Sequence, residues 1–83
     1  MKNIIFSDHS LIQCEERGVT KEEVIHAINE GSKEQAKMNR WMYKMNFQFN
    51  SYWGGKFYAI KQVAPVVKEN DDIIVVTVYS FFF

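Results

Sequence analysis

The chain has 83 residues, ten of them basic and ten acidic, and 47% of its side chains are hydrophobic and 16% aromatic. This composition excludes a disordered tail, and the length excludes a second core, so residues 1–83 are predicted to form a single domain. One cysteine excludes an internal disulfide and a thiolate-rich zinc site. No apolar run approaches the roughly 20 residues that span a bilayer, so we expect a cytoplasmic protein that does not enter a membrane.

A first helix is predicted over residues 8–17. Ser7 precedes it and is a favourable N-cap, because its hydroxyl can accept a hydrogen bond from an amide of the first turn. Leu11 and Cys14 share one side of this helix, which predicts that they face the core. Gly18 supplies the left-handed residue that ends it.

A second helix is predicted over residues 21–30. Thr20 and Glu23 have the spacing of a capping box, and Gly31 closes the helix. Each helix is shorter than the ~12–15 residues that an isolated helix needs, so both must pack on an apolar surface. Three apolar residues form the predicted buried stripe of the second helix: Val24, Ile25 and Ile28.

Residues 40–49 alternate between apolar and mostly polar side chains, which is typical of a strand with one buried face. The apolar positions are Trp41, Tyr43, Met45, Phe47 and Phe49.

Three further strands complete the pattern. A short polar strand over residues 33–37 precedes the alternating segment, with residues 38–40 as the turn. Another strand covers residues 56–64 and is ended or bulged by Pro65. The last covers residues 73–80, which are almost continuously β-branched and apolar, as in a central strand.

This order of elements predicts an α+β fold, with two N-terminal helices packed on one face of a three- to four-stranded antiparallel sheet. Alternation in the last strand places Ile74, Val76 and Val78 under the helices and leaves Thr77 and Tyr79 on the opposite face. Four side chains of the alternating segment are expected on that free face: Arg40, Lys44, Asn46 and Gln48. The sequence does not decide on which face of the sheet Lys61 lies, because this lysine shares a side of its strand with Phe57 and Val63.

The zero net charge hides an uneven distribution. Residues 33–68 carry seven basic groups against one acidic group, whereas the segments before and after them are acidic. Eight of the 13 aromatic residues lie in the same basic block. Basic groups interleaved with aromatic rings can neutralise phosphates and stack on bases, although the same pattern also fits core aromatics with solvated lysines behind them.

His9 and Arg17 are the first candidate catalytic residues. A neutral imidazole off the core side of the first helix can act as a general base or acid near neutral pH. The alternative is that His9 fixes the start of the helix through a hydrogen bond. Arg17 could hold a phosphate, or could complement the negative end of the helix just before Gly18.

Residues of the predicted strands supply the remaining candidates. Tyr79 could take part in proton transfer, and Thr77 could bind a phosphate. Arg40, Lys44 and Lys61 could stabilise the charge on a pentacoordinate phosphorus, although isolated lysines on strands are usually only solvated.

Metal and cofactor binding is not predicted. The soft ligands are His9, His26 and Cys14, and His9 and Cys14 point about 140° apart on one helix. Cys14 lies on the apolar side, where a thiol tends to be inert. The chain lacks a dinucleotide-binding glycine motif, a P-loop and a G-x-S-x-G motif.

Three motifs resemble the signature of an uncharacterised family of small bacterial domains, which runs F-S-x-H-A, then E-R-G-I-S, then T-x-Y. In this chain they are Phe6-Ser7-Asp8-His9-Ser10, Glu16-Arg17-Gly18-Val19-Thr20 and Thr77-Val78-Tyr79. That family is similar to RelE/ParE-like and BrnT-like toxins, several of which are metal-independent ribonucleases that act on messenger RNA and are neutralised by an antitoxin.

The resemblance implies a RelE-like toxin fold without a cofactor, and an antitoxin protein and RNA as partners. It also marks four residues as candidates for the functional site: His9, Arg17, Thr77 and Tyr79. We weigh two hypotheses. In the first, the protein is a toxin-like endoribonuclease that cleaves RNA by transesterification. In the second, it is a non-catalytic domain that binds another protein, or a second copy of itself, through its aromatic block and the segment 81–83.

Overall fold

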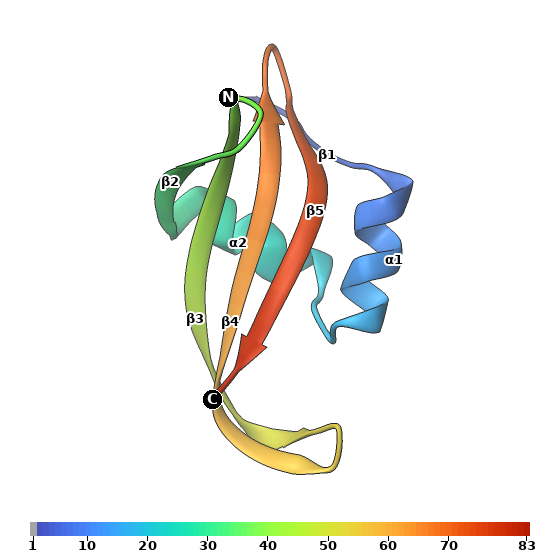
Figure 1. Ribbon diagram of the computed structural model, residues 1–83, viewed down its shortest axis with the longest axis vertical. Helices are drawn as coiled ribbons and strands as arrows, with labels where there is room; N and C mark the ends of the chain where they lie inside the picture. The colour runs from blue at the N-terminus through green and yellow to red at the C-terminus, as the bar shows by residue number, and fades with distance from the viewer. Residues whose placement is uncertain (1) are drawn as a thin grey trace.

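The computed structural model describes residues 2–83, which form a five-stranded sheet and two helices (Figure 1). The strand order across the sheet is β1-β5-β4-β3-β2. In chain order the elements are β1 (Ile4–Phe6), α1 (Asp8–Glu16), α2 (Lys21–Glu30), β2 (Ser32–Ala36), β3 (Arg40–Trp53), β4 (Lys56–Glu69) and β5 (Ile73–Phe82). No helix among residues 2–83 is long and apolar enough to span a bilayer.

The predicted α+β class is confirmed, but the predicted antiparallel sheet of three to four strands is wrong. The sheet has five strands and is mixed, because β1 pairs in parallel with the first residues of β5. A strand of three residues is too short to show an alternating pattern, and its partner lies about 70 residues later in the chain. Local sequence therefore carries no signal for this pairing.

The helix ends follow the predicted capping residues. Ser7 accepts a hydrogen bond from the amide of Ser10 at 3.1 Å, and Thr20 and Glu23 form both hydrogen bonds of the capping box. Gly18 has a φ of 66°, which lies in the left-handed region that glycine adopts without strain. These local signals set where α1 and α2 begin and where the chain turns between them.

The two helices occupy different positions against the sheet. In Figure 1, α2 lies behind the long strands, α1 stands beside β5, and the face toward the viewer carries no helix. The core beneath α2 contains Val24, Ala27 and Ile28 of the helix and the side chains of Tyr43, Val63 and Val67 from the sheet. Trp41, Met45 and Phe47 pack against this core, so the predicted buried face of β3 is confirmed.

α1 closes the edge of β5 with polar groups. The buried residues of this helix are Ser10, Gln13 and Cys14, whereas Leu11, which we expected in the core, is 38% exposed. Beyond its short pairing with β1, β5 presents main-chain groups that need partners. The Gln13 side-chain oxygen accepts a 2.8 Å hydrogen bond from the Val78 amide, and the Arg17 guanidinium donates a 2.7 Å bond to the Val78 carbonyl. The side of α1 that faces the sheet is therefore polar, because its side chains must form hydrogen bonds with the main chain at the edge of β5.

The predicted inward-facing residues of β5 require a correction. Val78 is fully buried as predicted, but its buried partner in this strand is Val75, and Ile74 and Val76 are only partly buried. The register with β4 shifts between Val66 and Val67, so that one extra residue is inserted into β5. This bulge interrupts the period of two that the prediction assumed.

β4 continues through Pro65 instead of ending before it. Pro65 lies opposite Val78, whose own N–H and C=O point away from β4 toward α1. A pair of this kind exchanges no ladder hydrogen bonds, so the missing N–H of proline leaves no β5 carbonyl without a partner. Of the two alternatives predicted at Pro65, an end of the strand is therefore wrong, and the pairing irregularity that the structure contains lies next to it, between Val66 and Val67.

A cluster of titratable groups ties the edge strand β2 to β4. The Tyr43 hydroxyl donates a hydrogen bond to the Glu69 carboxylate, and the Lys33 ammonium contacts the other carboxylate oxygen at 3.1 Å. Hydrogen bonding from Tyr43 holds the pKa of Glu69 below its ordinary value of 4.5, and burial raises the pKa of Tyr43. The ammonium of Lys33 also lies 4.5 Å from the centre of the Trp41 ring.

We expect this cluster to make stability depend on acid pH. Because the pKa of Glu69 is lower in the folded state, its contribution is present above about pH 4.5 and is lost as the pH falls through the folded-state pKa. Urea denaturation at several pH values should show this loss, and Glu69→Gln should flatten it. Glu34→Gln, which removes an exposed carboxylate from β2, serves as the matched control. Equal pH profiles for the protein and Glu69→Gln would contradict the assignment.

Candidate functional site

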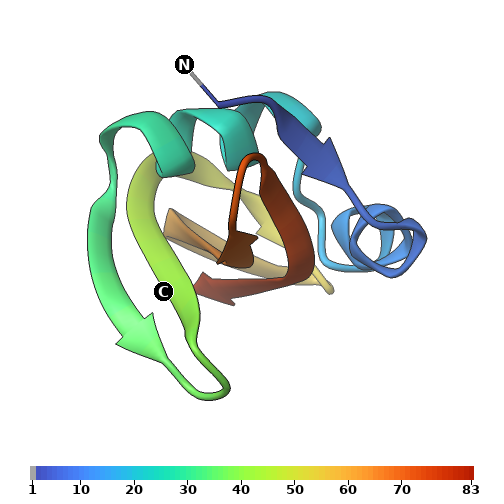
Figure 2. The same cartoon turned by 90° about the horizontal axis from the view of Figure 1, so that it is seen from above.

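The face of the sheet opposite α2, which we call the open face, holds a pocket of about 360 Å³. Figure 2 shows the β2–β3 hairpin projecting to this side, away from α2. Residues of the hairpin form one wall of the pocket. Strands β3, β4 and β5 supply the floor. The lining residues are Ala36, Lys37, Met38, Arg40, Met42, Val66, Thr77 and Tyr79.

The hairpin turn has the geometry that a tight β-connection requires. The amide of Arg40 donates a hydrogen bond to the carbonyl of Lys37, and the two residues between them, Met38 and Asn39, have φ values of 63° and 58°. Positive φ at both central positions is the mark of a type I′ turn, whose twist matches that of the flanking strands. The predicted turn is thus confirmed, with its centre at residues 38 and 39.

The structure brings together two of the predicted catalytic residues, Arg17 at the end of α1 and Tyr79 on β5. The guanidinium carbon of Arg17 lies 5.3 Å from the centre of the Tyr79 ring. The bond to the Val78 carbonyl uses one of the five N–H donors of the guanidinium and orients the group. The other donors and the positive charge are therefore positioned beside Tyr79, where they can hold an anion.

Thr77 and Arg40 share the pocket with Tyr79, so these candidates also lie on one surface. Lys37 adds a second cation at the hairpin wall, a residue that sequence reasoning had left out. Lys44 has its ammonium 2.7 Å from the Glu34 carboxylate, in an ion pair whose two side chains are both partly exposed. Such a pair is weak in water, so Lys44 can exchange Glu34 for another anion at little cost.

His9 lies apart from this group. It is exposed near the start of α1, eight residues before Arg17, which corresponds to about 12 Å along a helix axis. The start of α1 contacts β5 at Val75, whereas its end contacts Val78 and Ser80. The structure therefore brings Arg17 and Tyr79 together but leaves His9 at the opposite end of the helix.

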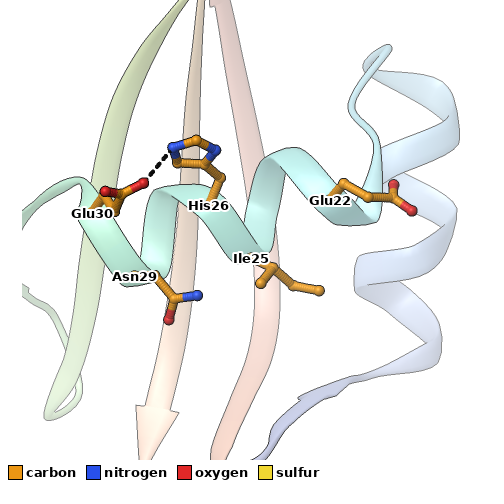
Figure 3. Close-up of a pocket in the computed structure, with 5 residues that line it drawn as sticks. All are labelled: Glu22, Ile25, His26, Asn29 and Glu30. Carbon is orange, nitrogen blue, oxygen red and sulfur yellow. Dashed lines mark ion pairs between the residues drawn. The ribbon is translucent and has the colours of Figure 1, made fainter.

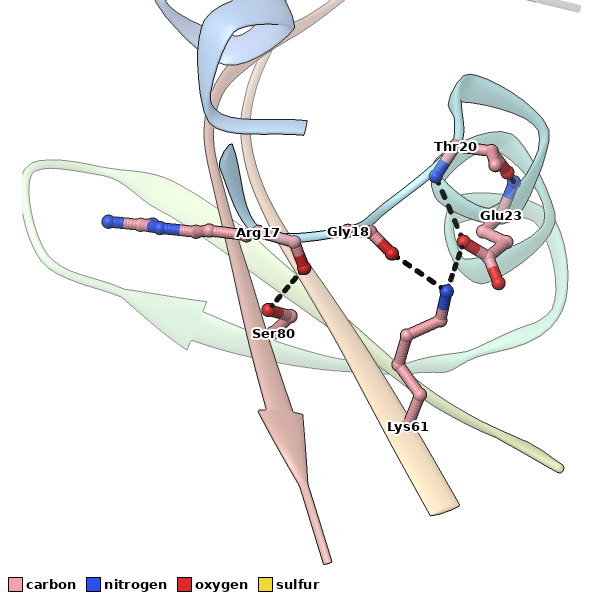
Figure 4. A network of polar contacts seen from close by, with 6 residues as sticks. All are labelled: Arg17, Gly18, Thr20, Glu23, Lys61 and Ser80. Carbon is pink, nitrogen blue, oxygen red and sulfur yellow. Dashed lines mark hydrogen bonds and ion pairs between the residues drawn. The ribbon is translucent and has the colours of Figure 1, made fainter. Parts of the chain in front are cut away.

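Lys61, a candidate for substrate binding, belongs to the covered side of the sheet. It is only 6% exposed, and its ammonium donates hydrogen bonds of 2.8 Å to the Gly18 carbonyl and 2.8 Å to the Glu23 carboxylate. Figure 4 shows this network, with the Arg17 side chain extending away from it. Lys61 thus joins β4 to the start of α2 and is not part of the pocket on the open face.

A second pocket, of about 410 Å³, lies on the outer side of α2. Its lining residues are Glu22, Ile25, His26, Asn29 and Glu30, and the His26 imidazole lies 2.6 Å from Glu30 (Figure 3). All of these side chains come from one helix, so no second element brings another group toward them. We therefore place the candidate site on the open face.

Within residues 2–83, no three side chains of His, Cys, Asp or Glu lie close enough together to hold a metal ion. Burial raises the pKa of the Cys14 thiol, which keeps it protonated and poorly nucleophilic.

Comparison with known proteins returned no match to a family model, to a curated protein or to a solved structure.

The contrast between Lys61 and Lys44 is open to a direct test. Lys61→Met leaves the Gly18 carbonyl and Glu23 without their buried partner, and we expect the free energy of unfolding to fall by about 1–3 kcal/mol. Lys44→Met removes a partly exposed ion pair of the same type, and we expect a change of about 1 kcal/mol at most. Urea denaturation measures both. Equal effects would contradict a structural role for Lys61.

Proposed function

We propose that the protein binds single-stranded RNA on its open face and cleaves it as a toxin-like, metal-independent endoribonuclease. The observation that carries this proposal is the contact between the Arg17 guanidinium and the Tyr79 ring, beside a pocket that also contains Arg40 and Thr77. The resemblance of the three sequence motifs to the toxin-related family agrees with it. An antitoxin protein is the expected protein partner under this proposal.

Binding follows from the arrangement of charge and rings. Arg17 stands at the β5 side of the open face, and Lys37 and Arg40 stand at the hairpin side, so cations flank the strip between them. Tyr79 lies on β5 between these flanks and is 40% exposed, and Phe81, two residues further along the strand, is 49% exposed. A single strand can place its phosphates near the cations and stack its bases on the rings, in the way of sequence-tolerant binding surfaces.

Cleavage would use Arg17 and Tyr79. The ribose 2′-oxygen attacks the adjacent phosphorus, its proton leaves to water, and the bond from phosphorus to the 5′-oxygen breaks. The Arg17 guanidinium stabilises the charge on the pentacoordinate phosphorus, and the Tyr79 hydroxyl protonates the departing 5′-oxygen. His9 has no step in this arrangement, because groups that act on one phosphate must converge on it.

The second candidate function is a protein-interaction domain. The far end of the β3–β4 hairpin exposes a pair of aromatic rings, Tyr52 and Phe57, whose centres lie 5.5 Å apart. Exposed apolar patches often mark protein interfaces, and Phe83 is also more than half exposed. This surface could bind an antitoxin, an unrelated protein or a second copy of the chain.

RNA binding is tested with a fluorescently labelled single strand of about 12 nucleotides, using fluorescence anisotropy at several salt concentrations. Arg40→Gln should weaken binding and reduce the slope of log affinity against log salt by about 1, as expected for one lost phosphate contact. Lys21→Gln, which removes the same charge from the first turn of α2 behind the sheet, should leave the slope unchanged. Equal losses in the two variants would mean that the open face is not the binding surface.

Cleavage is tested on total RNA in the presence of a metal chelator. Tyr79→Phe removes only the hydroxyl, and we expect it to slow cleavage by about 100-fold or more while binding persists. His9→Ala should slow cleavage by less than about tenfold, because His9 is remote from Tyr79. In cells, induced expression should arrest growth, and Tyr79→Phe should relieve the arrest.

Two outcomes would overturn this assignment. Loss of cleavage in a folded His9→Ala variant would place the reaction at the start of α1. Absence of both cleavage and growth arrest would leave the interaction domain as the function.

A further inference from the structure

Met38 occupies an unfavourable place in the hairpin turn. Its φ of 63° lies in the left-handed region, and its side chain is 79% exposed, the largest value among the exposed large hydrophobic residues of the described chain. A left-handed conformation costs a residue with a Cβ atom on the order of 1–2 kcal/mol, and exposure of the side chain recovers none of it through burial. Glycine, asparagine or aspartate would suit this position of a type I′ turn better.

The stability of the fold does not account for methionine at this position. A strained residue persists when its surroundings or its function require it, and the surroundings of Met38 are mostly solvent. The other central residue of the turn, Asn39, is by contrast a residue type that favours the left-handed region. Asn39 therefore suits the conformation of the turn, whereas Met38 does not.

The location of Met38 indicates what its side chain can contact. Met38 lines the pocket of the open face together with Thr77 and Tyr79 on the floor and Lys37 and Arg40 on the hairpin. At about 360 Å³ the pocket is at the small end of the range for ligand sites, so it suits one nucleotide rather than a larger ligand. A thioether is polarizable and flexible, which allows it to pack against a planar ring.

We propose that this pocket is a subsite for one nucleotide of the bound RNA, in which Met38 covers the base and Lys37 and Arg40 hold its phosphate. The inference rests on the proposed function, since it assumes that the ligand is a single strand of RNA. The charges support a phosphate at the hairpin wall, and the apolar floor formed by Met42 and Val66 supports a base beside it. Thr77 presents a hydroxyl group that can bond to the base or the ribose.

The test uses three variants and the same labelled RNA of about 12 nucleotides. Met38→Asn introduces a residue that favours the turn and removes the apolar side chain, so the melting temperature should stay or rise while the affinity falls about tenfold. Met38→Leu restores an apolar side chain and should recover most of the affinity. Asn39→Gly changes the neighbouring turn residue without touching Met38 and should bind as the unaltered protein does.

Each outcome decides the matter. Unchanged affinity in Met38→Asn, with RNA bound normally by the unaltered protein, would refute the subsite and leave the proposed function intact. An equal loss of affinity in Asn39→Gly would show that the shape of the turn matters and not the side chain, which also refutes it. A lower melting temperature in Met38→Asn would remove the premise that Met38 is strained. If the unaltered protein binds no RNA, the proposed function and the subsite fall together.

Discussion

The closure of the β5 edge by α1 is the constraint on which the arrangement of the molecule depends. β5 has a strand partner on that side for only three residues, and its remaining main-chain groups face a helix instead. Gln13 and Arg17 satisfy the amide and the carbonyl of Val78, and the Ser80 hydroxyl donates to the carbonyl of Arg17. Unpaired buried groups of this kind are expensive, so the helix and the strand edge are fixed to one another.

This closure also positions the candidate site. The bond to Val78 holds the Arg17 guanidinium at the margin of the sheet, which places it beside the exposed ring of Tyr79. Meanwhile α2 covers only the other face, and Lys61 locks that helix to β4 through Glu23. Arg17 can keep its hydrogen bond to Val78 and still contact a ligand, because its guanidinium carries several N–H donors. The open face and the position of Arg17 beside it are thus consequences of how the helices pack.

Much of the local structure could be predicted because its causes lie within a few residues. The capping box of α2 involves Thr20 and Glu23, three positions apart, and both hydrogen bonds are present. The alternation along β3 assigns Tyr43 to the core and Arg40 to the opposite surface, as observed. Of the candidate site, Arg40, Thr77 and Tyr79 were recognised from strand alternation and share one pocket.

The sequence by itself determined the two helices, the three long strands and the placement of Arg40, Thr77 and Tyr79 on the open face, because periodicity and capping act over short distances. Only the tertiary structure decided the parallel strand β1, the bulge in β5, the passage of β4 through Pro65 and the burial of Lys61. It likewise brought Arg17 next to Tyr79. Each of these features depends on groups that are far apart in the chain, such as the 61 positions that separate Arg17 from Val78, and the interactions that join them exist only after the sheet has formed.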